Sequence, residues 1–252
     1  MAECILEADN LSREFSGFRA VDDVSLRIER GSIHALIGPN GAGKTTCFNL
    51  LTKFLTPSSG RLVFEGQDIT GMKPAQVARL GIVRSFQISA TFANMTLLEN
   101  VRLALLSARG EPYRFWRSER TLRRFDGRAM ELLAMVGLED SARLIAAELS
   151  YGRKRALEIV TTLALEPKLL LLDEPTSGMG HEDIQPITDL IQKVAQHCTV
   201  LMVEHNLKVV SRLSSQITVL ARGKVIAEGN YAEVSKSPEV MAAYLGRNVS
   251  HA

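Results

Sequence analysis

A glycine-rich loop ending in a lysine and two threonines has the residues needed to hold phosphate groups. Glycines let backbone N–H groups turn toward phosphate oxygens, and a helix that starts at the loop directs its positive dipole end to the same place. Lys44 is expected to reach the β and γ phosphates of a nucleotide, and Thr45 to offer an oxygen to Mg²⁺. A chance match in a glycine-containing turn is the alternative, but the strand pattern before the loop and the helical pattern after it favour nucleotide binding. The loop reads Gly38, Pro39, Asn40, Gly41, Ala42, Gly43, Lys44, Thr45 and Thr46, which fits GxxxxGK followed by Ser or Thr.

Two adjacent carboxylates follow a run of leucines. Residues 169–172 are four leucines, and Asp173 and Glu174 come directly after them. Because ligands of open α/β sheets bind at the carboxyl ends of the strands, we expect Asp173 to lie beside the phosphate loop and to orient the ligands of Mg²⁺. Glu174 could accept a proton from an attacking water or position that water. A surface Asp-Glu pair at a strand end is the alternative, which the phosphate loop disfavours.

A sheet must position these residues, and the hydrophobic pattern predicts one. Residues 1–30 alternate apolar and polar side chains, as an antiparallel sheet with one solvated face does. The apolar run 33–37 is typical of a buried parallel strand, and this pattern resumes after a helical stretch at about 88–165. The pattern predicts an α/β fold with a helical insertion. Further strands are expected at 61–64, 81–86, 200–203, 217–220 and 224–228, helices at 44–54, 73–80, 153–165, 184–195 and 206–213, and a turn at 57–60.

Composition and charge exclude several classes of protein. The 252 residues suffice for one large domain, or for one domain with a sub-lobe. With 30 basic and 28 acidic side chains the net charge is +2, which argues against a nucleic-acid-binding protein. The three cysteines are widely spaced and predict free thiols in a reducing compartment. No apolar run reaches about 18 residues and the N-terminus does not resemble a signal peptide, so a role at a membrane is expected to need a partner.

Three further motifs accompany the phosphate loop and the carboxylate pair along the sequence. Gln87 and His205 each follow a predicted strand, and residues 149–153 read Leu-Ser-Tyr-Gly-Arg before a helical stretch. With the phosphate loop and the carboxylate pair, their order along nearly the whole chain resembles the ATP-binding subunits of ATP-binding-cassette (ABC) transporters. The resemblance implies an ATPase that binds ATP and Mg²⁺, folded as one ATP-binding domain over residues 1–252. It also implies a P-loop NTPase core with an antiparallel β subdomain and a helical subdomain at about 88–165.

The resemblance implies a role for each of these motifs. Gln87 would place its amide on Mg²⁺ and the attacking water, although a single glutamine is uninformative by itself. His205 would contact the γ-phosphate and link it to Glu174, whereas a lone histidine at a strand end is more often structural. Ser150 and Gly152 would hold the γ-phosphate of an ATP bound to the opposite subunit, because N–H groups are exposed at a helix start. Simple helix capping is the alternative for Ser150.

Single positions refine the resemblance. Phe15 matches the adenine-stacking aromatic residue of the family, with Phe18 as a second candidate and core packing as the alternative for both rings. Tyr151 replaces a glycine of the family signature, which is familiar in the branched-chain amino-acid import branch. Arg153 replaces the usual glutamine and leaves its hydrogen bonding open. Gly180 stands where the family's dimer loop has an aspartate, which leaves the coupling between two ATP sites open.

The expected partners follow from the same branch. The phosphate loop, residues 83–87, the signature and residues 237–246 resemble branched-chain amino-acid importers, a branch that also contains urea and aromatic-acid importers. The implied partners are a second ATPase subunit, identical or different, two transmembrane permeases and, indirectly, a periplasmic solute-binding protein, with no nucleic acid. The implied place is the cytoplasmic face of the bacterial inner membrane. The mechanism implied is a dimer that closes on ATP, moves the permeases and is reset by hydrolysis.

The helical region is expected to carry the groove that grips a permease, at about residues 88–148. Phe92, Met95 and Leu97 are candidates for that contact, and core packing is an equal alternative. Residues 109–128 hold seven arginines and three acids. This composition is typical of a solvated face, and the more specific alternative is a contact with lipid headgroups or a permease.

Rival functions remain open at this point. A non-transport ABC ATPase acting on DNA or ribosomes usually has two cassettes or a long coiled coil, and the sequence shows neither. A GTPase would carry an Asn-Lys-x-Asp motif, which is absent from the sequence, and a P-loop kinase would not need the signature helix. Glu174 argues against a purely regulatory nucleotide-binding module.

Overall fold

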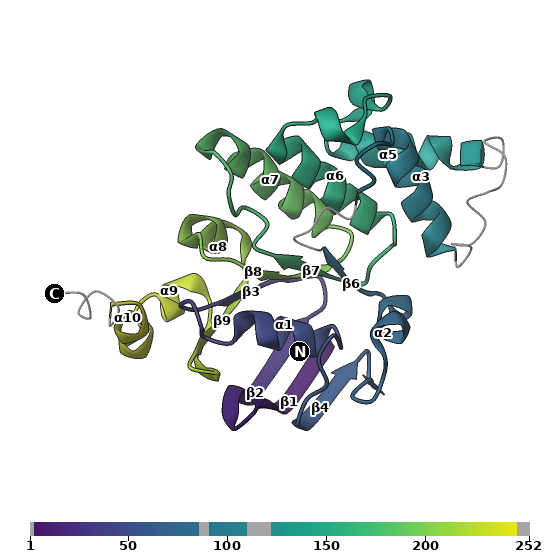
Figure 1. The fold of residues 1–252 in the computed structure, drawn as a ribbon. Helices are drawn as coiled ribbons and strands as arrows, with labels where there is room; N and C mark the ends of the chain where they lie inside the picture. Colours follow the sequence, from purple (N-terminus) through teal and green to yellow (C-terminus); the bar gives the residue numbers. More distant parts are fainter. Residues whose placement is uncertain (1–2, 86–90, 110–121, 246–252) are drawn as a thin grey trace.

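Two β-sheets and the helices around them make up the fold (Figure 1). The computed structural model describes residues 3–85, 91–109 and 122–245. The smaller sheet is antiparallel in the order β2-β1-β4-β5, and Leu6 pairs with Ile28 in its first hairpin. One face of β2 is buried because apolar and polar side chains alternate along it. The strands are β1 (Cys4–Phe15), β2 (Phe18–Glu29), β4 (Ser59–Phe64) and β5 (Gln67–Asp68).

The larger sheet has the order β10-β9-β3-β8-β7-β6, in which β10 runs antiparallel to β9 and the other pairs are parallel. Strands β3, β7 and β8 are buried along their whole length, as their continuous apolar sequence predicts. Val203 pairs with both Leu36 and Asp173, so these three strands end at the same edge. The strands are β3 (Ile33–Ile37), β6 (Ile82–Ser85), β7 (Leu169–Asp173), β8 (Thr199–Val203), β9 (Gln216–Ala221) and β10 (Lys224–Gly229).

Helix α1 (Lys44–Leu51) lies between the two sheets (Figure 1). Phe48 belongs to a core cluster that joins Leu6 of the small sheet to Leu171 of the large one. Because side chains alternate along a strand, Leu170 and Leu172 enter a second cluster on the opposite face of the large sheet. Each such buried leucine contributes about 2 kcal/mol of hydrophobic stabilisation. The helix and the loop before it are therefore held by both sheets.

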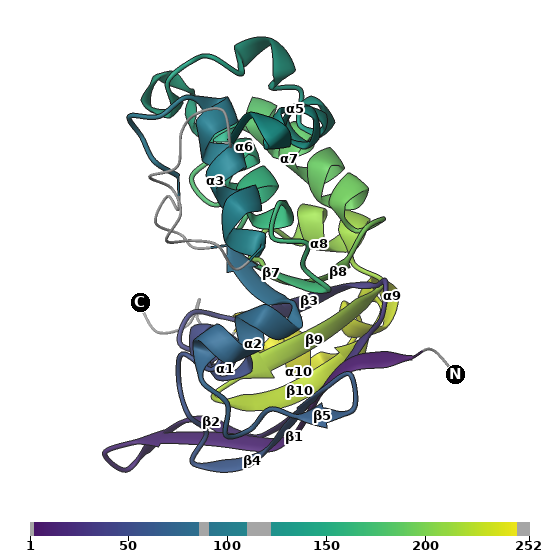
Figure 2. The same cartoon turned by 90° about the vertical axis from the view of Figure 1, so that its right-hand side faces the viewer.

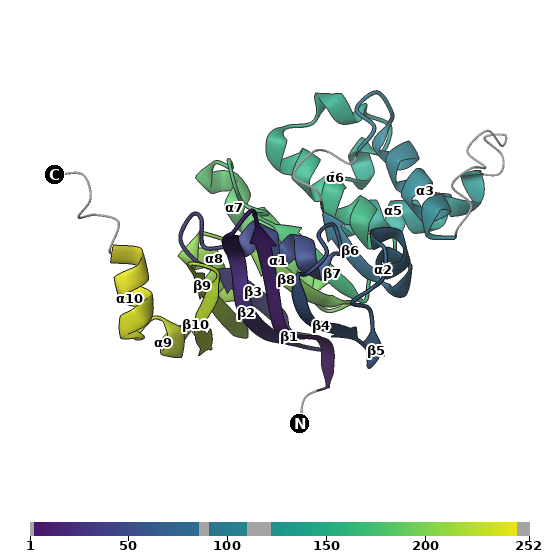
Figure 3. The same cartoon turned by 60° about the horizontal axis from the view of Figure 1, so that its bottom comes forward.

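Helices cover the second face of the larger sheet (Figure 2). The first of them, α3, begins at a capping box in which Thr96 accepts from the backbone of Glu99, and the Glu99 carboxylate accepts from the backbone of Thr96. Two short helices near the C-terminus pack against β10 (Figure 3). The helices are α2 (Pro74–Leu80), α3 (Leu97–Ala108), α5 (Asp126–Met135), α6 (Tyr151–Leu163), α7 (His181–Val194), α8 (Leu207–Leu213), α9 (Tyr231–Val234) and α10 (Pro238–Leu245), with 3₁₀ turns at Arg123–Phe125, Glu139–Ser141 and Ala146–Glu148.

The expected strands and helices are present, but some boundaries differ from the sequence prediction. Helix α1 ends at Leu51 rather than near residue 54, because Lys53 takes a left-handed backbone conformation with φ 61°. The predicted turn at 57–60 is wrong at its second half, because Gly60 is already part of β4. Gly60 has φ +97°, and a Cβ there would lie 2.4 Å from the carbonyl oxygen of Asn10. Only glycine allows the strand to start this way. The hydrophobic pattern predicted neither α9 nor α10.

The three apolar residues proposed for a permease contact separate in the structure. Leu97 is fully buried in the core, so the permease-contact interpretation is wrong for it. Phe92 and Met95 are 56% and 37% exposed, and core packing is wrong for these two. Of the arginine-rich segment, residues 110–121 lie outside the described part of the chain. Beyond that gap, Arg124 stacks on Phe125, with 4.7 Å from its guanidinium carbon to the ring centre.

The prediction of free thiols is confirmed for Cys4, Cys47 and Cys198. Burial raises the pKa of both Cys47 and Cys198 to about 12, which keeps these thiols protonated. Among the helices within residues 3–85, 91–109 and 122–245, none has the length and hydrophobicity to cross a membrane.

A buried histidine predicts that the fold loses stability in mild acid. His34 lies in β3, is fully buried and shares a hydrogen bond of 2.8 Å with Thr218, while burial lowers its pKa from 6.5 to about 4. The native state therefore keeps His34 neutral while the unfolded chain takes up a proton near pH 6.5. We expect the stabilising effect to be complete above pH 6.5 and to fall by roughly 3 kcal/mol as the pH drops toward 4.

Urea unfolding at several pH values between 7.5 and 4.5 measures this loss, with His34→Gln as the matched control because glutamine does not titrate. The variant is expected to show a shallower decline over the same range. An identical decline in both proteins would contradict the role of His34.

Candidate functional site

The phosphate loop follows β3 at the edge where β7 and β8 also end. Gly38 has φ +153°, and a Cβ there would lie 2.1 Å from the carbonyl oxygen of Leu220 in β9. At Gly43, with φ +101°, a Cβ would lie 2.4 Å from the carbonyl oxygen of Ala20. These two positions require glycine because neighbouring backbone occupies the space of a side chain. The loop thus packs tightly against the start of β2 and the end of β9.

The Lys44 ammonium group lies within this loop. It donates hydrogen bonds of 2.7 and 3.1 Å to the carbonyl oxygens of Gly38 and Pro39, and the residue is only 9% exposed. Helix α1 begins directly at Lys44, and Gly43 provides no side-chain cap for it. An uncapped helix start beside a lysine is suited to an anion such as a phosphate group. The other loop residues are Asn40, Gly41 and Thr45, which are exposed, Pro39 and Thr46, which are half-buried, and Ala42, which is buried.

Asp173 ends β7 at the same edge, with its side chain 4% exposed. Arg84 of β6 donates a 2.5 Å hydrogen bond to its Oδ2 atom and a second 2.5 Å bond to Asn49 of α1. Arg155 of α6 donates to the backbone oxygen of Asp173. Because Arg84 occupies Oδ2, Oδ1 is the oxygen of Asp173 that could face a metal ion. Arg84 therefore fixes the carboxylate of Asp173, and Arg155 fixes its backbone.

Glu174 and His205 come together just beyond the strands. Glu174 has the left-handed backbone conformation, with φ 45°, and its N–H donates to the carbonyl oxygen of Val203. This backbone conformation is unfavourable for a residue with a Cβ and persists where the surrounding structure enforces it. The His205 Nδ1 atom lies 4.0 Å from Glu174 Oε2, and the two side chains are 58% and 31% exposed. Gln87, predicted for the same edge, lies outside the described residues.

The signature segment lies at the start of α6. Ser150 is the N-cap residue of that helix, but its side chain accepts no capping hydrogen bond, so the capping alternative is wrong. At Gly152 a Cβ would lie 2.5 Å from the carboxylate of Asp183 in α7, so a side chain at this position would have to displace the end of the Asp183 side chain. The Tyr151 hydroxyl donates to the carbonyl oxygen of Ser177, within residues 176–180 of the same chain, the dimer-loop segment. Arg153 donates to the Ser141 hydroxyl, which answers the question of its hydrogen bonding.

Gly180 of the dimer-loop segment is the N-cap residue of α7 and supplies no side-chain cap. A Cβ there would lie 3.1 Å from the carboxylate of Glu182, which lies in the first turn of α7. An aspartate at this position would bring a second negative charge close to that carboxylate.

The two candidate adenine-stacking rings lie at the tip of the β1–β2 hairpin. Phe15 and Phe18 pair across it and are 41% and 68% exposed, so core packing is wrong for both. The Arg13 guanidinium lies 4.7 Å from the centre of the Phe15 ring. The same hairpin leads into Ala20, which touches the phosphate loop at Gly43. An exposed ring is therefore available beside the loop.

Sequence reasoning missed three residues of this edge: Arg84, Glu204 and Tyr244. Arg84 and Glu204 are charged residues within or directly after apolar strands, which is a signal of a buried polar partner. Glu204 is fully buried and accepts hydrogen bonds from both strand-end loops. Burial raises the pKa of the Tyr244 hydroxyl in α10, and a hydrogen bond with the backbone of Gly38 opposes that rise. No pattern in the sequence signals this last contact.

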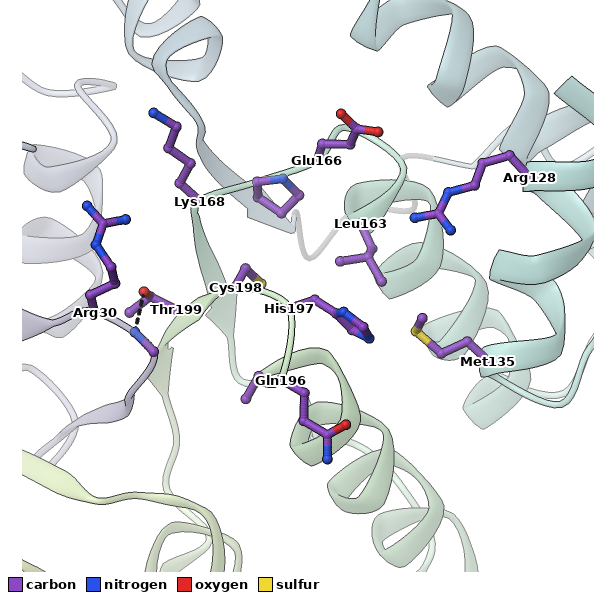
Figure 4. Close-up of a pocket in the computed structure, with 13 residues that line it drawn as sticks. Arg30, Arg128, Met135, Leu163, Glu166, Lys168, Gln196, His197, Cys198 and Thr199 are labelled. Carbon is purple, nitrogen blue, oxygen red and sulfur yellow. Dashed lines mark hydrogen bonds between the residues drawn. The ribbon is translucent and has the colours of Figure 1, made fainter.

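A cavity of about 550 Å³ lies at the opposite edge of the larger sheet (Figure 4). It is lined by residues at the amino ends of the strands, such as Lys168 before β7 and Cys198 before β8, and by Arg128 and Met135 of α5. None of the residues predicted for the nucleotide site lines it. The phosphate loop, Asp173, Glu174 and His205 therefore lie at the carboxyl edge and not in this cavity.

Comparison with known proteins agrees with this arrangement. A family model described as ABC transporter matches residues 21–177, and one described as branched-chain amino acid ATP-binding cassette transporter matches residues 224–249. The high-affinity branched-chain amino acid transport ATP-binding protein BraF of Pseudomonas aeruginosa is 37% identical over 98% of this chain and 99% of its own. The corresponding protein LivG of Escherichia coli K12 is 35% identical over the same shares.

Solved structures give the same result. The ADP conformation of MJ1267, an ATP-binding cassette of an ABC transporter, superposes with a TM-score of 0.84 at 31% identity, over 97% of this chain and 99% of that one. A dimeric post-hydrolysis state of the cassette MJ0796, bound to ADP and phosphate, has a TM-score of 0.73 at 26% identity, over 90% and 98% of the chains.

The fold and the phosphate loop define a P-loop nucleotide-binding protein of the ATP-binding-cassette type. The chain belongs to the ABC transporter family, in which it is an ATP-binding and ATP-hydrolysing protein. The fold class and the family expected from the sequence are thereby confirmed.

The buried Arg84–Asp173 pair leads to a prediction about stability. Replacing Arg84 by alanine leaves the buried Asp173 carboxylate and the Asn49 amide without this partner. We expect Arg84→Ala to lower the free energy of unfolding by about 3 kcal/mol. The matched control is Arg61→Ala, which breaks the exposed pair with Asp68 and should cost less than about 1 kcal/mol. Equal losses for the two variants in urea unfolding would show that Arg84 does not stabilise the buried carboxylate.

Proposed function

We propose that this chain is the ATPase subunit of an importer for branched-chain amino acids, acting through partner permeases. The observation that carries the proposal is the convergence of phosphate loop, Asp173, Glu174 and His205 at one edge of the sheet. Near full-length similarity to branched-chain amino acid transport ATP-binding proteins supports the solute class. The alternatives are the same mechanism serving urea or aromatic-acid import, or a non-transport ABC ATPase.

The chain's own residues would divide the work of ATP hydrolysis. Lys44 and the start of α1 would bind the phosphates, and Phe15 would stack on the adenine. Mg²⁺ fits the donor set, because the Thr45 hydroxyl and the free side of the Asp173 carboxylate offer oxygens; when bound it would offset phosphate charge. Glu174 would accept a proton from the attacking water or orient it. Gln87 would add a further oxygen toward the metal and the water, and His205 would contact the γ-phosphate.

A second subunit would complete each site. Ser150 and the start of α6 would hold the γ-phosphate bound by that partner, and the absence of a capping bond from Ser150 supports this use of the helix start. The dimeric state of a similar cassette supports a sandwich of two subunits around ATP. Closure favoured by ATP would then be the step that transmits energy. The partner could be identical to this chain or a different ATPase.

The remaining partners would be two transmembrane permeases and, indirectly, a periplasmic solute-binding protein. We place the chain at the cytoplasmic face of the bacterial inner membrane, as one ATP-binding domain over residues 1–252 with a helical subdomain at about 88–165. Phe92, Met95 and Leu144 are exposed apolar side chains of that subdomain, and Met95 and Leu144 lie on neighbouring backbone segments. They would form part of the permease contact.

Replacing Glu174 by glutamine tests the catalytic assignment. The amide keeps the size of the side chain but cannot take a proton, so hydrolysis is expected to fall at least about 100-fold while ATP still binds. Unhydrolysed ATP should then hold a dimer that size-exclusion chromatography with light scattering detects. A monomer at saturating Mg-ATP would contradict the sandwich, and full hydrolysis would contradict the role of Glu174.

Replacing Lys44 by alanine tests the transport assignment in cells. Loss of the ammonium group is expected to abolish hydrolysis and therefore uptake of labelled leucine by the source cells. Uptake of an unrelated solute is the control and should continue at its normal rate. Normal leucine uptake in cells whose Lys44→Ala protein no longer hydrolyses ATP would rule out the branched-chain solute and favour urea or an aromatic acid.

A further inference from the structure

Glu204, the residue between β8 and His205, has a fully buried side chain. Its Oε2 atom accepts hydrogen bonds from the backbone N–H groups of His205 and Asn206, at 2.9 and 3.0 Å. Its Oε1 atom accepts from the backbone N–H of Thr176, at 3.0 Å, and from the Thr176 hydroxyl, at 2.5 Å. Each oxygen thus serves one loop, and all four partners are donors. A buried carboxylate with four donors is well satisfied and has one fixed position.

The two loops that Glu204 joins are those that carry Glu174 and His205. Thr176 lies two residues after Glu174 and is itself only 5% exposed. On the other side of the same loop, the N–H of Glu174 donates to the carbonyl oxygen of Val203, the residue before Glu204. The loop after β7 is therefore attached to the end of β8 at two points, at the N–H of Glu174 itself and at Thr176.

This attachment matters because Glu174 is not in a relaxed conformation. Its backbone is left-handed, with φ 45°, a conformation that persists only where the surroundings enforce it. The His205 side chain is 58% exposed, so side-chain packing does little to fix it. Its Nδ1 atom lies 4.0 Å from both the Glu174 and the Glu204 carboxylates. The distance between Glu174 and His205 is therefore set by the backbone of the two loops that carry them.

We propose that Glu204 is a positioning residue, which holds Glu174 and His205 in register for hydrolysis by joining the loops that carry them. The proposal rests on the proposed function, because it takes Glu174 and His205 as the groups that act on the water and the γ-phosphate. In this arrangement Glu204 itself would contact neither the attacking water nor the γ-phosphate. Its loss should therefore lower kcat and leave the affinity for Mg-ATP nearly unchanged, because its four hydrogen bonds go to the loops of Glu174 and His205.

Steady-state hydrolysis and Mg-ATP binding by purified full-length variants test the proposal. Glu204→Gln keeps the shape but turns an amide NH₂ group toward donors, and it is expected to lower kcat about 10- to 100-fold with KM and Kd for Mg-ATP within about threefold. Thr176→Val removes one of the four hydrogen bonds without changing the buried shape, and should lower kcat by a smaller factor. The matched control is Asp126→Asn, which weakens the Arg102 pair far from the site and should leave kcat unchanged.

A double variant separates positioning from general destabilisation. Because Glu204 acts by setting the register between Glu174 and His205, replacing Glu204 should slow hydrolysis by a smaller factor in the Glu174→Gln background than in the wild type. A kcat of Glu204→Gln or Thr176→Val equal to that of the wild type, or a loss that adds fully to that of Glu174→Gln, would overturn the proposal while leaving the proposed function intact. If Glu204→Gln does not fold, Thr176→Val is measured in the wild-type and Glu174→Gln backgrounds instead, and its kcat values decide the question in the same way.

If Glu174→Gln itself hydrolyses ATP normally, the proposed function of Glu174 fails first, and the role of Glu204 fails with it. A dead Glu174→Gln together with a normal Glu204→Gln makes the failure specific to Glu204. The two failures are thus distinguished within one set of measurements.

Discussion

The parallel pairing of β3, β7 and β8 is the constraint on which the site depends. Val203 pairs with Leu36 on one side and with Asp173 on the other, so the three strands stop at one level. Each strand is buried along its length, and a shift in register would expose a leucine or valine to solvent and bury a charge. The hydrophobic core thereby fixes the level along the sheet at which the strands end and the phosphate loop, the carboxylates and the histidine follow.

Beyond the strand ends, buried polar contacts take over from apolar packing. Arg84 fixes Asp173 from β6, Arg155 reaches the same residue from the signature helix, and Glu204 joins the two following loops. Backbone close to Gly38 and Gly43 leaves no room for side chains, which forces the phosphate loop against β9 and β2. Glu174 keeps an unfavourable backbone conformation because several independent attachments around it hold the loop in place.

Sequence reasoning found the parts of the site that have a fixed spacing or a periodic context. The phosphate loop and the carboxylate pair are contiguous, and the strands before them are continuous apolar runs, so their place could be predicted. Leu97, in contrast, is buried while Met95 is exposed, and this difference in exposure comes from the way α3 packs. A short apolar sequence does not reveal such packing. Gly60 in β4 and the bond of Tyr244 to Gly38 depend on residues far away in the chain, and local pattern carries no information about such contacts.

We propose that ATP binds at the carboxyl edge of the larger sheet and not in the cavity at its amino edge. Hydrogen–deuterium exchange of the purified chain with and without Mg-ATP tests it most directly, because both edges are read in one experiment. We expect slower exchange in residues 38–46, 173–177 and 203–206 when nucleotide is added, with residues 195–199 beside the cavity unchanged. Protection confined to residues 195–199 and 166–168 would contradict it.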